Sequence, residues 1–401
     1  MNVLQFTSSY PRFAGDLSGI FVHELSLRLS RFAKISILCP DSFETKTFEI
    51  IERIKIYRFR YFIKKYQKLF HRKSVSESLR ENKFFYFFIP LVLIAEIISL
   101  HKTVLKEKID IVHAHWIFPQ GFIAVLVKCL FRLKYRVIIS SHGSDVYGLK
   151  FNLLKRLARW SLSRADYVCA VSSSLEKEIR LKISPHKPVS ILPMGVDSER
   201  FSKLNERIRG EDEEANPFIL YVGRLTKEKG VEYLIRAMPG ILKIKNNIKL
   251  YIIGFGDEEK RLRALASDLG LGKVVIFLGK LPNERLREYY STAQMLIFPS
   301  LSEGLGLVLV EALLCGCPVI ATKVGGIKDV IIDERTGLLV EPESPLQIVK
   351  AASRLLKDRE LRQKLIENGL FHAKENFSWQ SIGNKFMALY SKVLLDEKKT
   401  Y

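Results

Sequence analysis

Two glutamates stand eight positions apart around a glycine-rich turn in the segment MLIFPSLSEGLGLVLVEALLCGCPVIAT. The pattern predicts a strand that ends at the turn and a helix that opens around Gly306. The free backbone N–H groups at such a helix start form an anion site. Glu303 can reach ligand hydroxyl groups there, and Glu311, about two turns along, can approach a ligand beside the first turns. Two solvated glutamates are the alternative explanation of this spacing taken by itself.

A second candidate site lies in the segment YVGRLTKEKGVEYLIRA. Arg224 and Lys229 follow the predicted strand FILYVG, and two fixed cations beyond a strand end can neutralise a diphosphate. In other transferases a divalent metal held by paired aspartates does this, but the sequence contains no DxD. A solvated Lys/Arg pair in a loop is the alternative.

Polar residues also end a predicted strand in the first half of the chain. The segment RVIISSHGSDVYG ends its strand at His142, Gly143 and Asp145, and the carboxyl end of a parallel strand faces the ligand crevice of an open sheet. Asp145 is equally well explained as a turn or N-cap residue. His113 and His115 share one face of the strand in IDIVHAHW, but no third metal ligand is apparent, so we expect them to line a cleft at most.

The segment GFGDEEKRL, from Gly254, also places glycines between a predicted strand and a predicted helix. A dinucleotide fingerprint needs a third glycine and an acidic residue about twenty positions further on. The sequence has neither, so this pattern is weak.

The elements that must position these residues alternate between β-rich apolar runs and helical patterns, in two series. The first series stops near Val189, a polar stretch follows, and the second series starts at FILYVG. We predict two Rossmann-like, doubly wound α/β domains, 1–200 and 217–377, with a linker at 201–216 and a ligand cleft between the domains. The tail, 378–401, predicts an amphipathic helix that packs back across the domain boundary.

The positive charge is concentrated in the first half. The formal net charge is +21, and 32 Lys/Arg against 16 Asp/Glu give +16 before Ser198. The segment from Arg53 to Lys73 holds nine Lys/Arg, six aromatic rings and no carboxylate, a mixture that suits phosphates or anionic lipid headgroups. The apolar run from Phe84 to Leu100 is shorter than the ~20 residues of a membrane span and contains Pro90 and Glu96, which predicts a buried or interfacial helix. An ordinary solvated basic face beside a core helix is the alternative.

The cysteines and the N-terminus predict a protein of the cytosol. The five cysteines contain no CxxC pair and no metal-ligand spacing with histidine. The first residues run directly into a strand-like segment and lack the regions of a secretory signal, so we do not expect export.

The stretch EGLGLVLVE resembles the Ex7E motif of the retaining GT-B glycosyltransferases (glycosyltransferase family 4, glycosyl transferases group 1), and the likeness covers nearly the whole chain. The resemblance implies a GT-B fold of two facing domains, in which Glu303 contacts the donor sugar and Glu311 the nucleotide ribose. It also implies that donor sugar and phosphate lie on the backbone of Gly304, Leu305, Gly306 and Leu307.

Other segments are similar to further motifs of this family. The GR…KG pattern implies that Arg224 and Lys229 bind the donor diphosphate. The HGxD pattern implies that His142 lies near the donor sugar and the reacting centre. SGIFVHELSLRL resembles the family's Gly-Gly loop at the diphosphate, with Gly19 matching the second glycine and Ser18 in place of the first. The resemblance also makes the Gly254 loop cleft-facing and places the base near Leu281 and Pro282.

The function implied is transfer of a hexose-type sugar, with retention, from a UDP- or GDP-sugar to a saccharide or lipid-linked acceptor in polysaccharide or glycolipid assembly. No metal or other cofactor is expected, since Arg224, Lys229 and helix N-termini would stabilise the leaving diphosphate. An anionic membrane surface on the cytoplasmic side is an expected partner through the Arg53 to Lys73 segment, and nucleic acid is not.

Three alternatives belong to other classes. The first is another enzyme of the same fold: a nucleotide-sugar epimerase would convert the donor without any acceptor, and a phosphorylase would be larger and hold a cofactor covalently. A basic protein that binds nucleic acid or membrane without catalysis would explain the charge alone. An inactive relative that only binds is the third, and the presence of all the motif residues argues against it.

Overall fold

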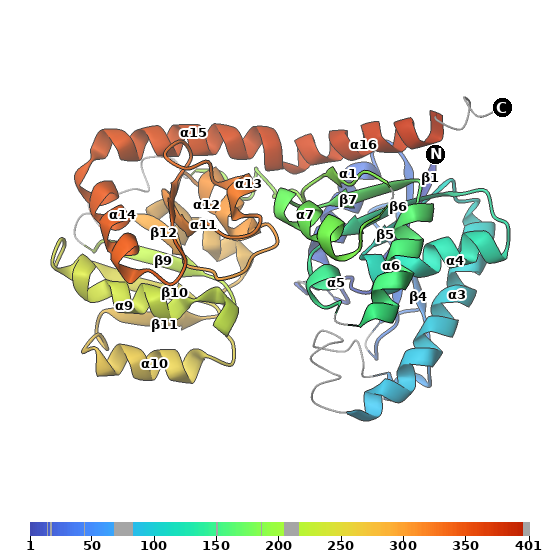
Figure 1. Ribbon diagram of the computed structural model, residues 1–401, viewed down its shortest axis with the longest axis horizontal. Helices are drawn as coiled ribbons and strands as arrows, with labels where there is room; N and C mark the ends of the chain where they lie inside the picture. Colours follow the sequence, from blue (N-terminus) through green and yellow to red (C-terminus); the bar gives the residue numbers. More distant parts are fainter. Residues whose placement is uncertain are drawn as a thin grey trace. The chain divides into compact units, whose positions relative to one another are not determined.

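The computed structural model describes residues 1–13, 15–16, 18–43, 45–67, 83–149, 151–185, 187–203 and 216–395. The chain divides into two compact units. The first comprises Met1–Met194 with Ile382–Tyr401, and the second Gly195–Ser381. Each unit is an α/β domain built on its own parallel sheet, and we call them the N-terminal and C-terminal domains (Figure 1).

The N-terminal domain is built on an eight-stranded sheet within the described residues, in the order β3-β4-β2-β1-β5-β6-β7-β8. All neighbouring strands pair in parallel except β3 and β4, which form an antiparallel edge. The strands are β1 (Asn2–Phe6), β2 (Lys34–Pro40), β3 (Phe48–Ile51), β4 (Ile54–Phe59), β5 (Ile111–His115), β6 (Arg136–Ser141), β7 (Tyr167–Ala170) and β8 (Ser190–Ile191).

The central strands of this sheet are buried along their length, as expected when helices cover both faces of a parallel sheet. The alternation of strands and helices predicted from the sequence is present. The helices are α1 (Ile20–Leu29), α3 (Phe88–Glu107), α4 (Phe122–Leu130), α5 (Ser144–Tyr147), α6 (Asn152–Arg164) and α7 (Ser173–Lys182), with a π-helical turn, η3 (Ile117–Gly121), before α4.

The C-terminal domain has a six-stranded, all-parallel sheet within the described residues, in the order β11-β10-β9-β12-β13-β14. This order matches the Rossmann order 3-2-1-4-5-6. Its strands are β9 (Phe218–Val222), β10 (Lys249–Ile253), β11 (Val275–Gly279), β12 (Met295–Phe298), β13 (Val319–Thr322) and β14 (Leu338–Val340). Its helices are α9 (Val231–Leu242), α10 (Glu259–Asp268), α11 (Asn283–Thr292), α12 (Leu307–Leu314), α13 (Ile327–Val330), α14 (Pro345–Lys357) and α15 (Arg359–Phe377).

The last helix, α16 (Trp379–Leu395), belongs to the N-terminal domain from Ile382 onward. Its side chains Ile382, Phe386, Tyr390 and Val393, spaced four, four and three apart, are all buried. This spacing puts them on one face of the helix. The tail therefore supplies core residues to a domain whose other residues end at Met194, with the whole C-terminal domain between them in the chain.

The predicted linker begins too early at 201. Phe201 is buried, and its ring centroid lies 6.1 Å from that of Tyr290 in the C-terminal domain. The Arg287 side chain donates hydrogen bonds to Ser202. Residues 201–203 are thus packed in that domain, while most of the predicted linker, 204–215, lies outside the described residues.

The basic segment from Arg53 to Lys73 was expected to bind headgroups or to form a solvated face. In its first half, basic side chains instead form ion pairs within the domain. Ile54–Phe59 is strand β4, and its basic side chains pair with carboxylates of the same domain. Lys55 pairs with Glu107, Arg58 with Glu49 and Arg60 with Asp41. Three basic side chains are thus paired within the domain; Arg58 is buried, whereas Lys55 and Arg60, which follows the strand, stay 43% and 53% exposed. Residues 68–73 lie outside the described residues.

The apolar run from Phe84 forms a longer helix than predicted. Together with the turn before it, α3 reaches from Phe85 to Glu107 and is long and apolar enough, by length and composition, to cross a membrane. Pro90 does not break the helix because it lies in the first turn, where a backbone N–H has no helical partner. Glu96 is fully buried and accepts a hydrogen bond of 2.8 Å from Gln120, and burial raises its pKa to about 8. One face of α3 is thus packed on the domain.

Candidate functional site

The C-terminal sheet has its topological switch point between β9 and β12. From β9 the chain proceeds to β10 and β11 on one side, and the later strands lie on the other side, starting with β12. Ligands of doubly wound sheets bind beyond the carboxyl ends of the strands at such a point. The loops that leave these two strands carry Arg224, Lys229 and Glu303, so the structure brings these predicted site residues to one edge of one sheet.

Lys229 and Glu303 contact each other directly. The Lys229 Nζ lies 2.5 Å from Glu303 Oε2, and both side chains are mostly buried. The backbone N–H of Gly304 donates to Glu303 Oε1 at 3.1 Å, and Lys229 Nζ lies 5.4 Å from the centre of the Phe298 ring. A charged pair held in this way presents one cation and one carboxylate at fixed positions.

The two loops are locked together by their backbones. Leu301 N donates to Glu228 O at 2.7 Å, and Ser300 Oγ donates to the same oxygen at 3.1 Å. Gly230 has a φ of 59°, and a Cβ at this position would lie 2.3 Å from the Pro299 carbonyl oxygen. Only glycine fits there, so the close approach of the loops depends on the glycine of the KG pair.

Helix α12 begins directly after this contact. Its N-cap, Gly306, has a φ of 88° and no side chain that caps the helix, so the first backbone N–H groups point outward. The exposed Arg224 lies on the other loop, and its carbonyl accepts a hydrogen bond from Tyr221. The edge therefore combines a helix start with two cations, an arrangement suited to an anion such as a diphosphate.

Glu311 lies in α12, as predicted, but in an environment that the sequence did not reveal. The hydroxyl of the fully buried Tyr290 donates to Glu311 Oε2 at 2.8 Å. Burial raises the pKa of Glu311 to about 7, while the hydrogen bond from Tyr290 and the charge of Arg200 lower it. No motif marks Tyr290 or Arg200, because their roles follow from contacts made only in the fold.

The glycine loop after β10 packs against the same edge. Gly254 has a φ of 143°, and a Cβ there would lie 1.8 Å from the Gly223 carbonyl oxygen. Gly254 thus allows two loops at this edge of the sheet to touch. This contact explains why a glycine is needed at the position, and no direct contact with a ligand has to be assumed. Leu281 and Pro282 follow β11, the next strand along.

In the N-terminal domain the switch point lies between β1 and β5. The loop after β1 leads to Gly19, the N-cap of α1, which has a φ of 62°. A Cβ at Gly19 would lie 2.1 Å from the Ser9 carbonyl oxygen. Ser18 stands where the family pattern has a glycine. Its backbone N–H donates a hydrogen bond to the Asp16 carboxylate, and the Arg12 guanidinium donates one to its hydroxyl. The left-handed turn at the helix start is therefore formed by Gly19.

His142 follows β6 and is surrounded by rings. Its Nε2 lies 3.0 Å from His115 Nδ1, and the centroids of Phe21 and Trp116 lie 4.7 and 5.2 Å from its own. Trp116 has a φ of 77°, a strained backbone conformation for a non-glycine residue. Burial lowers the pKa of His142 to about 3, so the ring is neutral at pH 7.

Asp145 organises the loop around His142. Its Oδ1 accepts hydrogen bonds from Ser141 Oγ and from the N–H groups of His142 and Gly143, and its Oδ2 accepts one from Ile117 N. The carboxylate is occupied by these four donors, which agrees with the turn-residue interpretation of Asp145.

His113 and His115 are fully buried. We expected His115 to line a cleft at most, and the structure places it behind His142, because its strand is in the middle of the sheet. Within the described part of the chain no group of three or more His, Cys, Asp or Glu is arranged to hold a metal ion.

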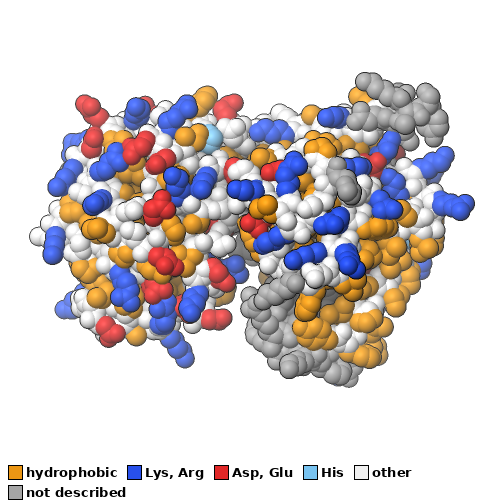
Figure 2. Space-filling model, in the orientation of Figure 1, with side chains coloured by type: hydrophobic (Ala, Val, Ile, Leu, Met, Phe, Trp, Pro, Cys, Tyr) orange, Lys and Arg blue, Asp and Glu red, His pale blue; other side chains and the backbone are white. Residues whose placement is uncertain are grey.

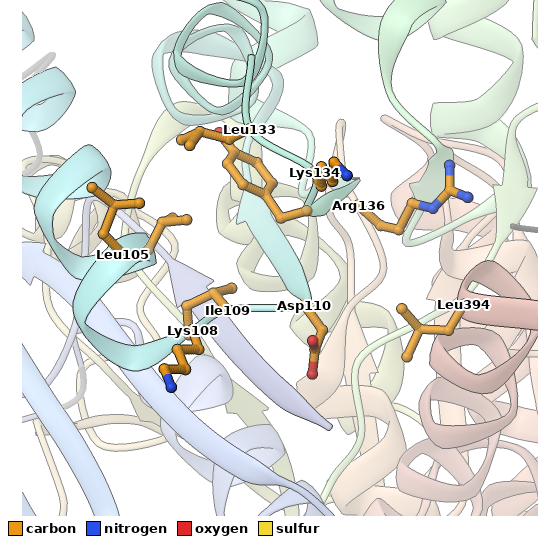
Figure 3. Close-up of a pocket in the computed structure, with 10 residues that line it drawn as sticks. Leu105, Lys108, Ile109, Asp110, Leu133, Lys134, Arg136 and Leu394 are labelled. Carbon is orange, nitrogen blue, oxygen red and sulfur yellow. The ribbon is translucent and has the colours of Figure 1, made fainter. Parts of the chain in front are cut away.

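A cavity of about 380 Å³ lies at the opposite edge of the N-terminal sheet (Figure 3). Asp110, which precedes β5, and Arg136, which starts β6, are among its lining residues, together with Leu105, Lys108 and Leu394. It is thus at the amino ends of these strands, whereas His115 and His142 are at their carboxyl ends. The cavity is not part of the candidate site.

Comparisons with known proteins agree with this architecture. The profile of Glycosyltransferase Family 4 matches residues 18–200, and that of Glycosyl transferases group 1 matches residues 202–370. An uncharacterized glycosyltransferase of Methanocaldococcus jannaschii is 31% identical over 71% of this chain and 75% of its own. The N-acetyl-alpha-D-glucosaminyl L-malate synthase of Bacillus anthracis is 30% identical over 73% and 77%. The solved structure of Anabaena HepE in complex with UDP and glucose superimposes with a TM-score of 0.73, at 17% identity and over 97% and 99% of the two chains.

We predict that Gly19→Ala destabilises the N-terminal domain more than Gly15→Ala does. Both residues have a positive φ, which costs a side chain about 1–2 kcal/mol, but a Cβ at Gly15 meets no atom within 4 Å, whereas one at Gly19 clashes with Ser9. Thermal unfolding of both variants measures the difference. Equal melting temperatures would show that the backbone contact at Gly19 is not tight.

Proposed function

The chain belongs to the group 1 glycosyl transferases of glycosyltransferase family 4, and on this basis we propose that it transfers a hexose-type sugar from a UDP- or GDP-sugar with retention of configuration. That it is a glycosyltransferase of the GT-B type follows from the family and the fold. We further propose that no metal is required and that the acceptor is a saccharide or a lipid-linked sugar used in polysaccharide or glycolipid assembly.

The observation that best supports the proposed donor site is the Lys229–Glu303 contact at the switch point of the C-terminal sheet. In the reaction the bond between the anomeric carbon and the leaving diphosphate oxygen breaks, and negative charge grows on the diphosphate. Lys229, Arg224 and the N–H groups at the start of α12 would stabilise this charge, as preorganised donors do in a transition state. Two fixed cations supply here what a divalent ion supplies elsewhere, which is the basis for proposing metal independence.

The carboxylate of Glu303 would accept hydrogen bonds from hydroxyls of the donor sugar. Its position is set by Lys229 and by the N–H of Gly304, so it needs no reorganisation when the sugar binds. Backbone N–H groups from Gly304 to Leu307 would hold the sugar and the phosphate, and Glu311 would accept from the ribose hydroxyls. In the N-terminal domain we assign Gly19 to the diphosphate and His142 to the donor sugar.

The acceptor hydroxyl would attack the face from which the diphosphate departs, and the leaving phosphate oxygen would take its proton. No protein base is then required. Three histidines of the N-terminal domain fit this scheme, because burial lowers the pKa of His113, His115 and His142 and so makes their rings weak bases.

We also propose that the enzyme works at the cytoplasmic face of an anionic membrane. The exposed face of α3 supports this more strongly than the basic segment does. Phe87, Ile94, Ile98 and Leu105 form an exposed apolar stripe, with Lys102 and Lys106 near its end. Figure 2 shows hydrophobic side chains gathered over this helix. Apolar side chains beside lysines are the combination that binds an anionic bilayer surface.

Lys229→Ala and Glu303→Ala are each expected to lower the transfer rate by at least two to three orders of magnitude, since each removes a preorganised charge from the transition state. Lys227→Ala is the matched control, because Lys227 is an exposed lysine of the same turn. Steady-state transfer assays, with thermal unfolding to confirm folding, make the measurement. Normal turnover by either site variant would refute the donor site.

Donor binding should weaken as the pH falls through about 7. The ribose hydroxyls need the ionised carboxylate of Glu311 as acceptor, and its pKa of about 7 means that affinity is complete above pH 8 and falls about tenfold per unit below pH 6. Calorimetry with an intact nucleotide sugar, whose diphosphate does not titrate in this range, gives the profile. Tyr290→Phe should move the midpoint upward and Glu311→Gln should flatten the curve; a flat wild-type profile from pH 6 to 8 would contradict the ribose assignment.

Replacing Ile94, Ile98 and Leu105 together by serine should weaken sedimentation with anionic vesicles by about tenfold or more, because three apolar side chains no longer enter the bilayer. The matched control replaces Leu346 and Phe371, exposed apolar residues of the C-terminal domain, by serine. A second variant neutralises Lys64, Lys65 and Lys68, of which Lys68 lies outside the described residues. The proposal fails if wild-type protein does not sediment with such vesicles.

A further inference from the structure

A continuous chain of hydrogen bonds runs through the core of the N-terminal domain behind His142. It joins His142 Nε2 to His115 Nδ1 at 3.0 Å and His115 Nε2 to Gln5 Oε1 at 2.8 Å. It continues from Gln5 Nε2 to the Tyr390 hydroxyl at 3.0 Å, then to His113 Nδ1 at 2.7 Å. We call the residues of this chain the histidine relay. Tyr390 reaches it from α16, 385 positions from Gln5.

Every ring in the relay is neutral. Burial lowers the pKa of His113 to about 3 and that of His142 to about 3, and it lowers the pKa of His115 far below its ordinary value. A neutral imidazole has one nitrogen that donates a hydrogen bond and one that accepts. The direction of any one bond in the relay therefore fixes the direction of all the others.

The Gln5 amide sets that direction. Its carbonyl oxygen faces His115 Nε2, so this nitrogen carries the proton and donates. His115 Nδ1 must then accept, and it can accept only if His142 Nε2 is protonated. It follows that Nδ1 of His142 is an acceptor. Among the described residues, no group donates a hydrogen bond to that nitrogen.

The far end of the relay agrees with this direction. The Gln5 N–H donates to the Tyr390 hydroxyl, which in turn donates to His113 Nδ1. His113 Nε2 then donates to Ser140 Oγ at 2.8 Å. A serine hydroxyl can accept this hydrogen bond, so this last partner is compatible with the same direction.

We propose that Tyr390 is a positioning residue that, through Gln5 and His115, holds His142 as the tautomer protonated at Nε2, with Nδ1 free to accept a hydrogen bond from a ligand. The ligand group at His142 is then a donor such as a sugar hydroxyl, because the lone pair of Nδ1 repels a phosphate oxygen. The last step, recognition of a sugar hydroxyl, rests on the proposed transferase function. The tautomer itself does not.

The direct test is long-range proton–nitrogen NMR of the full chain labelled with ¹⁵N-histidine, without substrate. The signals of His142 are assigned by comparison with His142→Gln. We expect a protonated Nε2 and an unprotonated Nδ1 for His142 at pH 7. A protonated Nδ1 would overturn the proposal, whatever the protein catalyses.

Tyr390→Phe tests the role of α16. Without the hydroxyl, Gln5 loses its acceptor and the amide is no longer held, so His142 should change from one tautomer to a mixture. Tyr135→Phe is the matched control, because the buried Tyr135 hydroxyl bonds to Ala124 O in the same domain and does not touch the relay. Its His142 signals should equal those of the wild type. If Tyr390→Phe does not fold, Gln5→Met replaces it in the test. This variant breaks the relay between Tyr390 and His115, and it should give the same mixture of His142 tautomers.

Kinetics separate the relay from the transferase proposal. If both hold, Tyr390→Phe lowers kcat/KM by roughly three- to tenfold, the effect of one misdirected hydrogen bond, and Tyr135→Phe leaves it unchanged. If the His142 tautomer changes in Tyr390→Phe but kcat/KM does not, the relay is confirmed and the role of His142 in sugar recognition is refuted. An unshifted tautomer in Tyr390→Phe would overturn the role of Tyr390.

Discussion

The proposed donor site depends on one constraint, the close backbone contact between the loops that leave β9 and β12. Gly230 packs on the Pro299 carbonyl, and Glu228 O accepts bonds from Ser300 and Leu301. This contact brings Lys229 and Glu303, 74 positions apart, within 2.5 Å of each other. Because the contact lies at the switch point, the same geometry also aims the start of α12 at the place where a ligand of a doubly wound sheet binds.

The two domains use buried polar groups differently. In the C-terminal domain, charges lie at the edge of the sheet, where a Lys229–Glu303 pair and a Glu311 carboxyl with a raised pKa can respond to a charged ligand. In the N-terminal domain, three neutral histidines, Gln5 and Tyr390 form a continuous relay of hydrogen bonds inside the core. Such networks tend to specify one arrangement, because each broken bond leaves a buried group unsatisfied.

The sequence predicted what local patterns encode. Alternating apolar runs gave the two α/β sheets, and the motifs around Glu303, Lys229 and His142 marked the loops at the strand ends. It did not predict the pairing of Arg58 with Glu49, the burial of His115 behind His142, or the roles of Tyr290 and Tyr390. These depend on contacts between residues far apart in the chain, for which a single sequence has no periodic signal. Residues 201–203 were assigned to a linker for the same reason, since Phe201 becomes a core residue only through Tyr290.

We propose that the edge built around Lys229 and Glu303 binds a nucleotide sugar without a metal. The most direct measurement is a thermal-shift screen of UDP- and GDP-sugars in the presence of a chelator, followed by assays of nucleotide release. We expect at least one nucleotide sugar to stabilise the protein and to be slowly hydrolysed under these conditions. No stabilisation by any of them, or binding that appears only when a divalent metal is added, would contradict it.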